Sequence, residues 1–231
     1  LLAQKCFSMY YYYPLIGRYL AGTTASGIYE ARLSQEKMGK ENHVFKPAYE
    51  AEEITALAAI CDHIVFNSFS QWERFGAAAR AQGASCGIRI NPERSTQEHA
   101  IYDPCAPGSR LGVKIAEFPE TLPEGIDGLH FHTLCEQGAD ALAVTLAAVE
   151  EKFGKYLHGL KWLNFGGGHH ITRADYDVAL LEELIRHVQE TYDVAVYLEP
   201  GEAVALNAGY LAASVLDVRA DGNVILNTSA A

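Results

Sequence analysis

Three features are scarce in this sequence: long hydrophobic runs, paired cysteines and basic residues. No apolar run approaches the ~20 residues of a membrane-spanning helix, so no membrane partner is expected. The five cysteines are an odd number without CxxC spacing, which predicts a reducing, cytoplasmic setting and no disulfide framework. Lys and Arg total 18 against 29 Asp and Glu, and this formal charge of -11 argues against a nucleic-acid partner.

What is present suits a globular protein. A hydrophobic content of 49% over 231 residues can form the core of one large domain or two small ones. The first residues already lie in an apolar run, and the last follow the strand-like segment 224–226. We therefore expect a fragment whose N-terminal and C-terminal flanks are missing.

Short β-rich runs alternate with longer helical patterns along the chain, which is typical of parallel sheets with right-handed crossovers. The predicted strands cover residues 1–5, 22–25, 42–46, 63–67, 87–91, 128–132, 162–165 and 195–199. The predicted helices cover residues 9–20, 27–39, 50–60, 69–82, 114–119, 137–153 and 176–191. Eight strands in this alternation predict an α/β fold of the (β/α)8 TIM-barrel class.

We expect the barrel to occupy residues 1–201. A second, β-rich unit is predicted over residues 202–231, with strand-like patterns at 202–215 and 223–226. The tyrosines at positions 10–13 are expected to form a helix packing face.

In a TIM barrel the active site lies at the C-terminal ends of the strands. A lysine, an arginine, an asparagine, a histidine, three glycines and a carboxylate fall at these predicted ends, and Glu30 lies just beyond one of them. The residues are Lys5, Glu30, Arg89, Asn91, His132, Gly166, Gly167, Gly168 and Glu199.

Each residue type indicates a role and leaves a plainer alternative. Three glycines between a strand and a helix let backbone N–H groups approach a phosphate, although a tight turn would use the same residues. Strand alternation points His130 and His132 together into the barrel, where either could be a core histidine. Arg89 in a β-branched run needs an anionic partner if it is buried.

Together these residues fit pyridoxal phosphate, which needs an amine for a Schiff base, an anion site, a flat group against its ring and a partner for its pyridine nitrogen. A metal-dependent barrel hydrolase is the alternative, because His169 and His170 follow the glycines. The scarcity of carboxylates at the other strand ends weakens that alternative.

The chain resembles the alanine racemase-like, fold-type III pyridoxal-phosphate-dependent decarboxylases, a family that includes the ornithine, diaminopimelate and carboxynorspermidine decarboxylases. Within the family it is most similar to the carboxynorspermidine branch. The motifs extend in family order over essentially the whole chain: AQKCFSM (3–9), GTTAS (22–26), YEAR (29–32), NS (67–68), RINP (89–92), GSRLGV (108–113), HFHTLCEQ (130–137), NFGGGHH (164–170) and LEPGEA (198–203).

The resemblance implies a role for each strand-end residue. Lys5 would hold pyridoxal 5'-phosphate as a Schiff base, and His132 would stack on the cofactor ring. Gly166, Gly167 and Gly168 would cradle the phosphate. Glu199 would pair with the pyridine nitrogen and keep it protonated.

Four further residues follow from the same resemblance. Arg89 and Glu30 match positions of ring-side polar contacts. Cys135 stands where ornithine decarboxylase-like relatives have a phosphate-contacting serine. Glu202 stands where those relatives have a phosphate-contacting arginine, and we expect it to bind a substrate ammonium instead.

The resemblance implies a carboxy-lyase of polyamine biosynthesis, which converts carboxynorspermidine or carboxyspermidine to norspermidine or spermidine. It also implies a homodimer whose active site is completed by a C-terminal β-domain, so we expect the fragment alone to be inactive. Two alternatives within the same fold are a diaminopimelate- or ornithine-type decarboxylase and a non-catalytic pyridoxal-phosphate-binding barrel.

Overall fold

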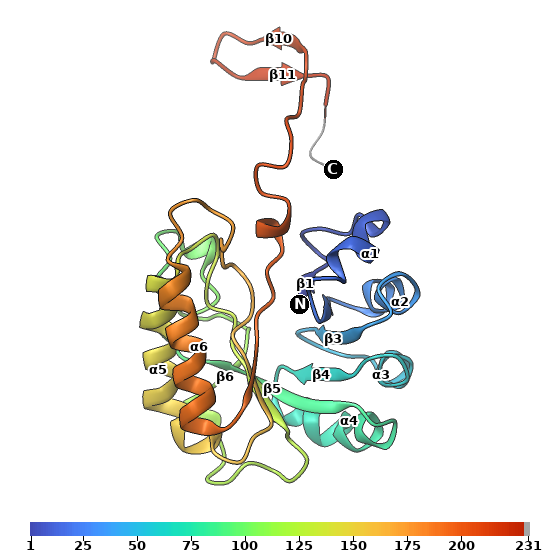
Figure 1. The fold of residues 1–231 in the computed structure, drawn as a ribbon, viewed down its shortest axis with the longest axis vertical. Coiled ribbons are helices and arrows are strands. Elements are labelled where there is room, and N and C mark those ends of the chain that lie inside the picture. Colours follow the sequence, from blue (N-terminus) through green and yellow to red (C-terminus); the bar gives the residue numbers. More distant parts are fainter. Residues whose placement is uncertain (229–231) are drawn as a thin grey trace.

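The computed structural model describes residues 1–228, and eight of its strands form one curved parallel sheet (Figure 1). They are paired in the order β1-β2-β3-β4-β5-β7-β8-β9. Their bounds are β1 (Leu2–Ala3), β2 (Gly22–Ala25), β3 (Glu41–Phe45), β4 (His63–Phe66), β5 (Ser85–Asn91), β7 (Gly128–His130), β8 (Trp162–Asn164) and β9 (Ala195–Tyr197). All eight predicted strands are present, and the predicted TIM-barrel fold class is confirmed.

The two ends of this sheet meet. The backbone N–H of Ala3 donates to the carbonyl of Pro200 over 2.9 Å, and the amino group of Leu1 donates to the carbonyl of Leu198 over 2.7 Å. The segment that follows β9 therefore lies beside β1. This brings the strand ends that carry Lys5 and Glu199 to the same mouth.

Helices pack on the outside of the sheet, with α2, α3 and α4 on one side and α5 and α6 on the other (Figure 1). Their bounds are α2 (Ile28–Lys37), α3 (Ala51–Ala58), α4 (Phe69–Ala81), α5 (Ala139–Leu157) and α6 (Val178–Tyr192). No helix among residues 1–228 is both long and apolar enough to cross a membrane.

Local chemistry explains where α4 and α6 begin. The hydroxyl of Ser68 accepts from the N–H of Gln71, and the carboxylate of Asp177 accepts from the N–H of Leu180. Each side chain satisfies one of the N–H groups that a helix start leaves unpaired.

The core lies between the strands and the inward faces of these helices. Leu142, Leu146, Val149 and Phe153 recur at helical spacing on α5 and are essentially inaccessible to water. The strand residues that they cover are equally buried, as expected for a parallel sheet with helices on its outer face.

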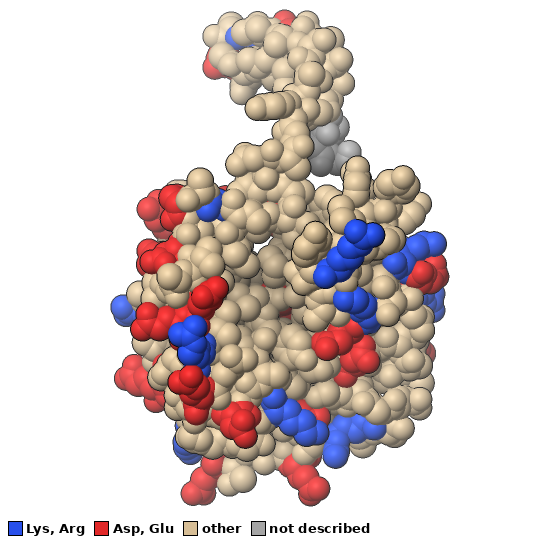
Figure 2. Space-filling view, viewed as in Figure 1, with Lys and Arg blue, Asp and Glu red and all other residues tan. Residues whose placement is uncertain are grey.

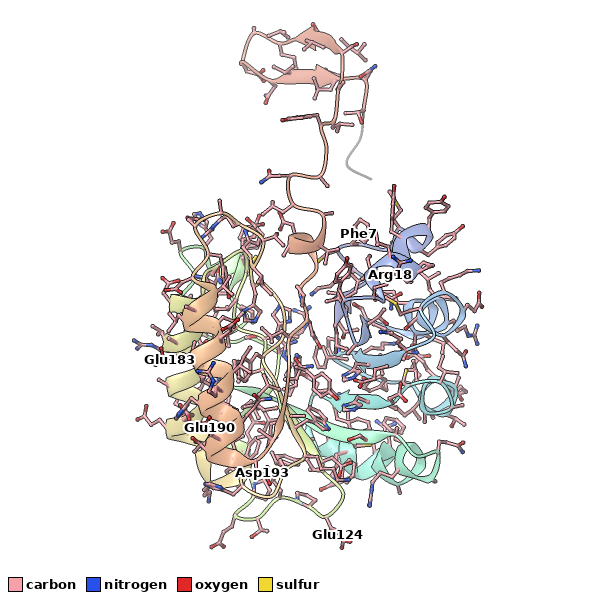
Figure 3. All side chains as sticks on the ribbon, viewed as in Figure 1. Phe7, Arg18, Glu124, Glu183, Glu190 and Asp193 are labelled. Carbon is pink, nitrogen blue, oxygen red and sulfur yellow. The ribbon has the colours of Figure 1, made fainter. Side chains whose placement is uncertain are left out.

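Acidic side chains gather over the α5 and α6 side of the barrel (Figure 2). Glu183 and Glu190 lie on exposed positions of α6, and Asp193 follows its last turn (Figure 3). These carboxylates are solvated on the helical exterior, so much of the negative charge of the chain lies away from the strand ends.

The predicted helix over residues 114–119 is wrong, and the one over residues 9–20 is only partly confirmed. Residues 114–119 begin with β6 (Val113–Lys114), which pairs with the outer end of β5, and continue as the 3-10 turn η3 (Ile115–Glu117). The free edge of β5 beyond its pairing with β7 offers this segment a strand partner. Residues 9–20 form only η1 (Tyr10–Tyr12) and α1 (Tyr13–Ile16), which ends at Gly17.

The predicted tyrosine packing face is also wrong for three of its four members. Tyr10, Tyr11 and Tyr12 are exposed, and only Tyr13 is buried. In a 3-10 turn successive side chains point in different directions, so one short turn cannot bury all four rings.

The segment after the barrel differs from the prediction as well. The prediction of a strand over residues 202–215 is wrong. This segment begins with the 3-10 turn η4 (Glu202–Val204) and continues without regular structure as far as β10. The hairpin of β10 (Val215–Val218) and β11 (Val224–Leu226) confirms the second strand (Figure 1). A domain boundary at residue 201 stays a prediction, and residues 229–231 of the expected second unit lie outside the described residues.

Candidate active site

Eight of the predicted site residues line two adjoining cavities at the strand ends. Lys5, His132 and Glu199 line both cavities. The first cavity, of about 220 Å³, is also lined by Arg89. The second, of about 250 Å³, is also lined by Gly167, Gly168, Cys135 and Glu202.

Glu199 is the buried carboxylate between these cavities, and only 7% of it is exposed. The Asn164 amide donates to its Oε1 over 2.9 Å, and its Oε2 lies 3.7 Å from His130 Nε2 and 4.0 Å from His132 Nδ1. Burial acts to raise the pKa of this carboxyl, but the polar groups of His130, His132 and Asn164 outweigh it and hold the pKa below its usual range. Glu199 is therefore ionised at neutral pH.

His132 presents a neutral, flat ring to the same space. The N–H of Gly167 donates to its Nδ1 over 3.3 Å, so the proton of the neutral ring lies on Nε2. Burial lowers the pKa of His132 well below its usual value, and the positive charges of Arg89 and Lys5 lower it further. A ring that remains uncharged can lie against a planar ligand without a second cation being buried.

Arg89 is 5% exposed, but its predicted anionic partner is absent from residues 1–228. Its guanidinium instead donates to the carbonyl of His132 over 3.2 Å and lies 4.6 Å from the centroid of the Phe45 ring. Burial lowers the pKa of Arg89 to about 10, with the Glu199 charge acting in the opposite direction. Because this pKa is still well above 7, the guanidinium is protonated at neutral pH, and a carbonyl and an aromatic face take the place of a contacting carboxylate.

The three glycines form a loop that only glycine allows. Gly166 and Gly168 have φ values of +71° and +84°. A Cβ on Gly167 would lie 2.6 Å from the carbonyl oxygen of Glu199, and a Cβ on Gly168 would lie 2.1 Å from that of Leu134. The loop is thus pressed against the neighbouring strand ends.

This loop and the start of η4 can bind an anion. Within residues 1–228, no hydrogen bond uses the backbone N–H of Gly168, Gly201 or Glu202. All three residues line the second cavity. Free N–H groups that converge on one space are the usual donors of a phosphate site.

Glu30 does not line either cavity. It lies on α2, where its carboxylate accepts from the N–H of Ser26 over 2.6 Å, near the start of the helix. This contact is that of a capping carboxylate. Its predicted role beside the cofactor ring has no support in the lining of the cavities.

Cys135 and Glu202 face the second cavity, as their positions in the motifs suggest. The Glu202 carboxylate lies 3.3 Å from Nε2 of His170 and is half exposed. Asn91, at the end of β5, instead donates to the carbonyls of Pro104 and Leu111 and supports the loop that follows.

Sequence reasoning did not assign Asn164 to the site. Its Nδ2 donates to Glu199, while its Oδ1 accepts from the N–H of Gly166, so one side chain supports both the carboxylate and the glycine loop. Its position at the end of a predicted strand, immediately before the glycines, is the sequence feature that could have indicated this role. In the sheet, Asn164 is in register with His130 and Tyr197.

Gln137 was given no role, although it is the last residue of the HFHTLCEQ motif. Its backbone pairs with the glycine loop, and its side chain bonds Thr96 and Gln97 of the segment that follows β5. These residues border a third cavity of about 560 Å³, which shares Cys135 and Glu136 with the second. Gln137 therefore ties the wall of this larger space to the glycine loop.

His130, His132 and Glu199 also offer ligand atoms close enough together to hold a metal ion. Lys5 and Arg89 add two positive charges beside this group, which disfavours a bound cation. The same charges favour an anionic ligand.

Comparison with known proteins identifies relatives. The chain is 45% identical over 218 residues to the carboxynorspermidine/carboxyspermidine decarboxylase of Campylobacter jejuni subsp. jejuni, which covers 94% of this chain and 56% of the relative. It is 39% identical over 219 residues to the carboxyaminopropylagmatine decarboxylase of Synechocystis sp., with 94% and 57% covered. No protein-family model matches the chain.

The fold is similar to a crystal structure of carboxynorspermidine decarboxylase from Campylobacter jejuni complexed with norspermidine. The TM-score is 0.84 at 43% identity, and the match covers 98% of this chain and 58% of that one. The chain therefore spans somewhat more than half the length of these relatives.

Proposed function

From the premise that this chain is a homologue of the carboxynorspermidine/carboxyspermidine decarboxylases, we propose that the protein is a pyridoxal-phosphate-dependent carboxy-lyase of polyamine biosynthesis. The observation that carries the proposal is the convergence of Lys5, His132 and Glu199 on cavities that also contain the glycine loop. These residues come from separate strand ends. Folding therefore brings together an amine, a flat ring and a carboxylate, the types of group that the cofactor requires.

The residues present fit pyridoxal phosphate. Lys5 lines both cavities, and its amine forms no hydrogen bond or ion pair within residues 1–228. The unpaired N–H groups of Gly168, Gly201 and Glu202 suit a phosphate, while ionised Glu199 suits a protonated ring nitrogen. When bound, the cofactor supplies an electron sink for loss of a carboxylate as carbon dioxide.

The chain's own residues then have distinct tasks. Lys5 would hold the cofactor through its amine, and Glu199 would hold a proton at the ring nitrogen through charge attraction. His132, whose orientation is fixed by the Gly167 N–H, would offer its flat ring to the cofactor. Arg89 supplies a buried positive charge in the wall of the first cavity.

For the substrate we propose a carboxylated polyamine, carboxynorspermidine or carboxyspermidine. The similarity to enzymes with these substrates supports the proposal, as does the acidic side of the second cavity, where Glu136 and Glu202 can attract an ammonium group. Carboxyaminopropylagmatine is the second candidate, because the Synechocystis relative is 39% identical. A cytoplasmic homodimer remains part of the proposal.

Absorbance tests the cofactor directly. The full-length protein purified with pyridoxal phosphate should show a visible absorbance band that borohydride bleaches, as expected of a lysine Schiff base. Lys5→Ala should abolish the band. Lys161→Ala is the matched control, because Lys161 is an exposed lysine paired with Asp127 away from the cavities, and this variant should keep the band.

Release of carbon dioxide tests the substrate. Carboxynorspermidine, carboxyspermidine and carboxyaminopropylagmatine should be compared at equal concentration with the full-length protein. Carbon dioxide from none of the three, by a protein that has the absorbance band, would contradict the decarboxylase and leave a non-catalytic cofactor carrier.

A further inference from the structure

We propose that His130 is a positioning residue that holds the Glu199 carboxylate in place for the cofactor, an inference that rests on the function proposed above. His130 ends β7, and its Nε2 lies 3.7 Å from the carboxylate of Glu199, which lines both cavities. Neither the comparisons nor the motif roles assign it a task.

The burial of His130 makes its lack of partners informative. Only 1% of the residue is exposed, and neither ring nitrogen forms a hydrogen bond within residues 1–228. Its Nε2 lies 3.7 Å from Glu199 Oε2. This distance exceeds that of a hydrogen bond, but contacts in ligand-free sites commonly tighten when the ligand binds. A buried polar ring without a partner is costly unless it serves such a contact.

The two oxygens of Glu199 have different neighbours. The Asn164 amide already donates to Oε1, whereas the two histidines are the polar side chains recorded beside Oε2 within residues 1–228. His132 cannot donate from Nδ1, because that nitrogen accepts the N–H of Gly167. The N–H that can turn to Oε2 is therefore the one on Nε2 of His130.

Burial lowers the pKa of His130 and keeps the ring neutral. The negative charge of Glu199 raises the pKa of His130, whereas the positive charges of Arg89 and Lys5 lower it. The neighbouring His132 ring is uncharged. Burial lowers the pKa of His130 more than Glu199 raises it. A neutral imidazole can donate to the carboxylate without neutralising the charge that the ring nitrogen of the cofactor requires.

The ring of Phe45 on β3 packs beside His130, with the two ring centroids 5.5 Å apart. Asn164 and His130 would then hold one carboxylate oxygen each and fix the plane of Glu199. The remaining lone pairs of the carboxylate would be directed toward the cofactor.

A double-mutant cycle on the full-length protein tests this role. His130→Phe keeps an aromatic ring but removes the donor, and it should weaken pyridoxal-phosphate affinity about tenfold, which corresponds to about 1.4 kcal/mol. In a Glu199→Gln background the same change should alter affinity by less than about twofold, because the partner carboxylate is gone. His130→Gln offers an amide N–H of similar reach and should restore most of the affinity.

His63→Phe is the matched control, since it removes another imidazole from inside the barrel, where His63 stacks on His43 at 3.9 Å. It should leave affinity unchanged. If the thermal unfolding midpoint shows that the His130→Phe variant does not fold, His130→Leu takes its place in the cycle.

Two results would overturn the inference: an unchanged affinity in His130→Phe, or an equal loss in the Glu199→Gln background, which would show that His130 acts only on packing. Failure of the proposed function is a separate result, because in that case the wild-type protein itself would not bind pyridoxal phosphate through Lys5.

Discussion

Replacing Gly168 by alanine should damage both stability and the cofactor site. The residue has a φ of +84°, and adopting this conformation costs an alanine about 1–2 kcal/mol. The new Cβ would also lie 2.1 Å from the carbonyl oxygen of Leu134 and 2.3 Å from its carbonyl carbon. A backbone cannot yield as a flexible side chain does, so this overlap adds about 1–3 kcal/mol. The total loss of unfolding free energy should reach about 2–5 kcal/mol.

Gly39 provides the matched control. It has a φ of +63°, and a Cβ there would meet nothing within 4 Å. Gly39→Ala should therefore cost only the conformational part, about 1–2 kcal/mol, and should leave cofactor binding unchanged. The difference between the two variants isolates the close approach of the glycine loop to Leu134.

Urea denaturation followed by circular dichroism measures the stability of both variants, and titration of the apoprotein with pyridoxal phosphate measures affinity. Relief of the overlap must shift the Leu134 backbone, and with it the wall of the cavity at Cys135, so Gly168→Ala should also bind the cofactor more weakly. If Gly168→Ala were no less stable than Gly39→Ala and bound the cofactor normally, the glycine loop would not be packed as described.

Two more changes probe the interior. Asn164→Ala removes the donor to Glu199 and the acceptor for the Gly166 N–H, so the unfolding free energy in urea should fall by about 2–4 kcal/mol; a loss below about 0.5 kcal/mol would contradict the buried pair of bonds. Burial, together with the neighbouring His43, lowers the pKa of His63 to about 3. Below about pH 6.5 the imidazole is therefore protonated in the unfolded chain but still neutral in the folded one. Stability should therefore fall as the pH drops from about 6.5 toward 3, by at most about 1.4 kcal/mol per unit from this group, and His63→Phe should have a flatter urea-midpoint profile; parallel profiles would refute the assignment.

The local pattern of the sequence was sufficient for much of the fold. Short β-rich runs between amphipathic segments predicted all eight strands of the main sheet. The cap at Asp177 is a local feature of this kind, because its hydrogen bond to the N–H of Leu180 lies within one turn of the chain. The strand β6 could not be predicted in this way, because its partner is the free edge of β5, a feature that exists only after the sheet has formed.

For the site, the sequence by itself determined which residues stand at the strand ends. Parallel strands all finish at one side of the sheet, so Lys5, His132 and Glu199 had to approach the same mouth. Their roles toward the cofactor remain predictions that the proposed experiments test.

Only the tertiary structure decided how these groups are paired. Asn164 and His130 take their places beside Glu199 through the register of β7, β8 and β9. Arg89 meets a carbonyl and an aromatic ring rather than a carboxylate, and Glu30 turns to its own helix start. Spacing along a chain sets which end of a strand a residue occupies, but contacts between strands depend on curvature and register, which arise when the sheet closes.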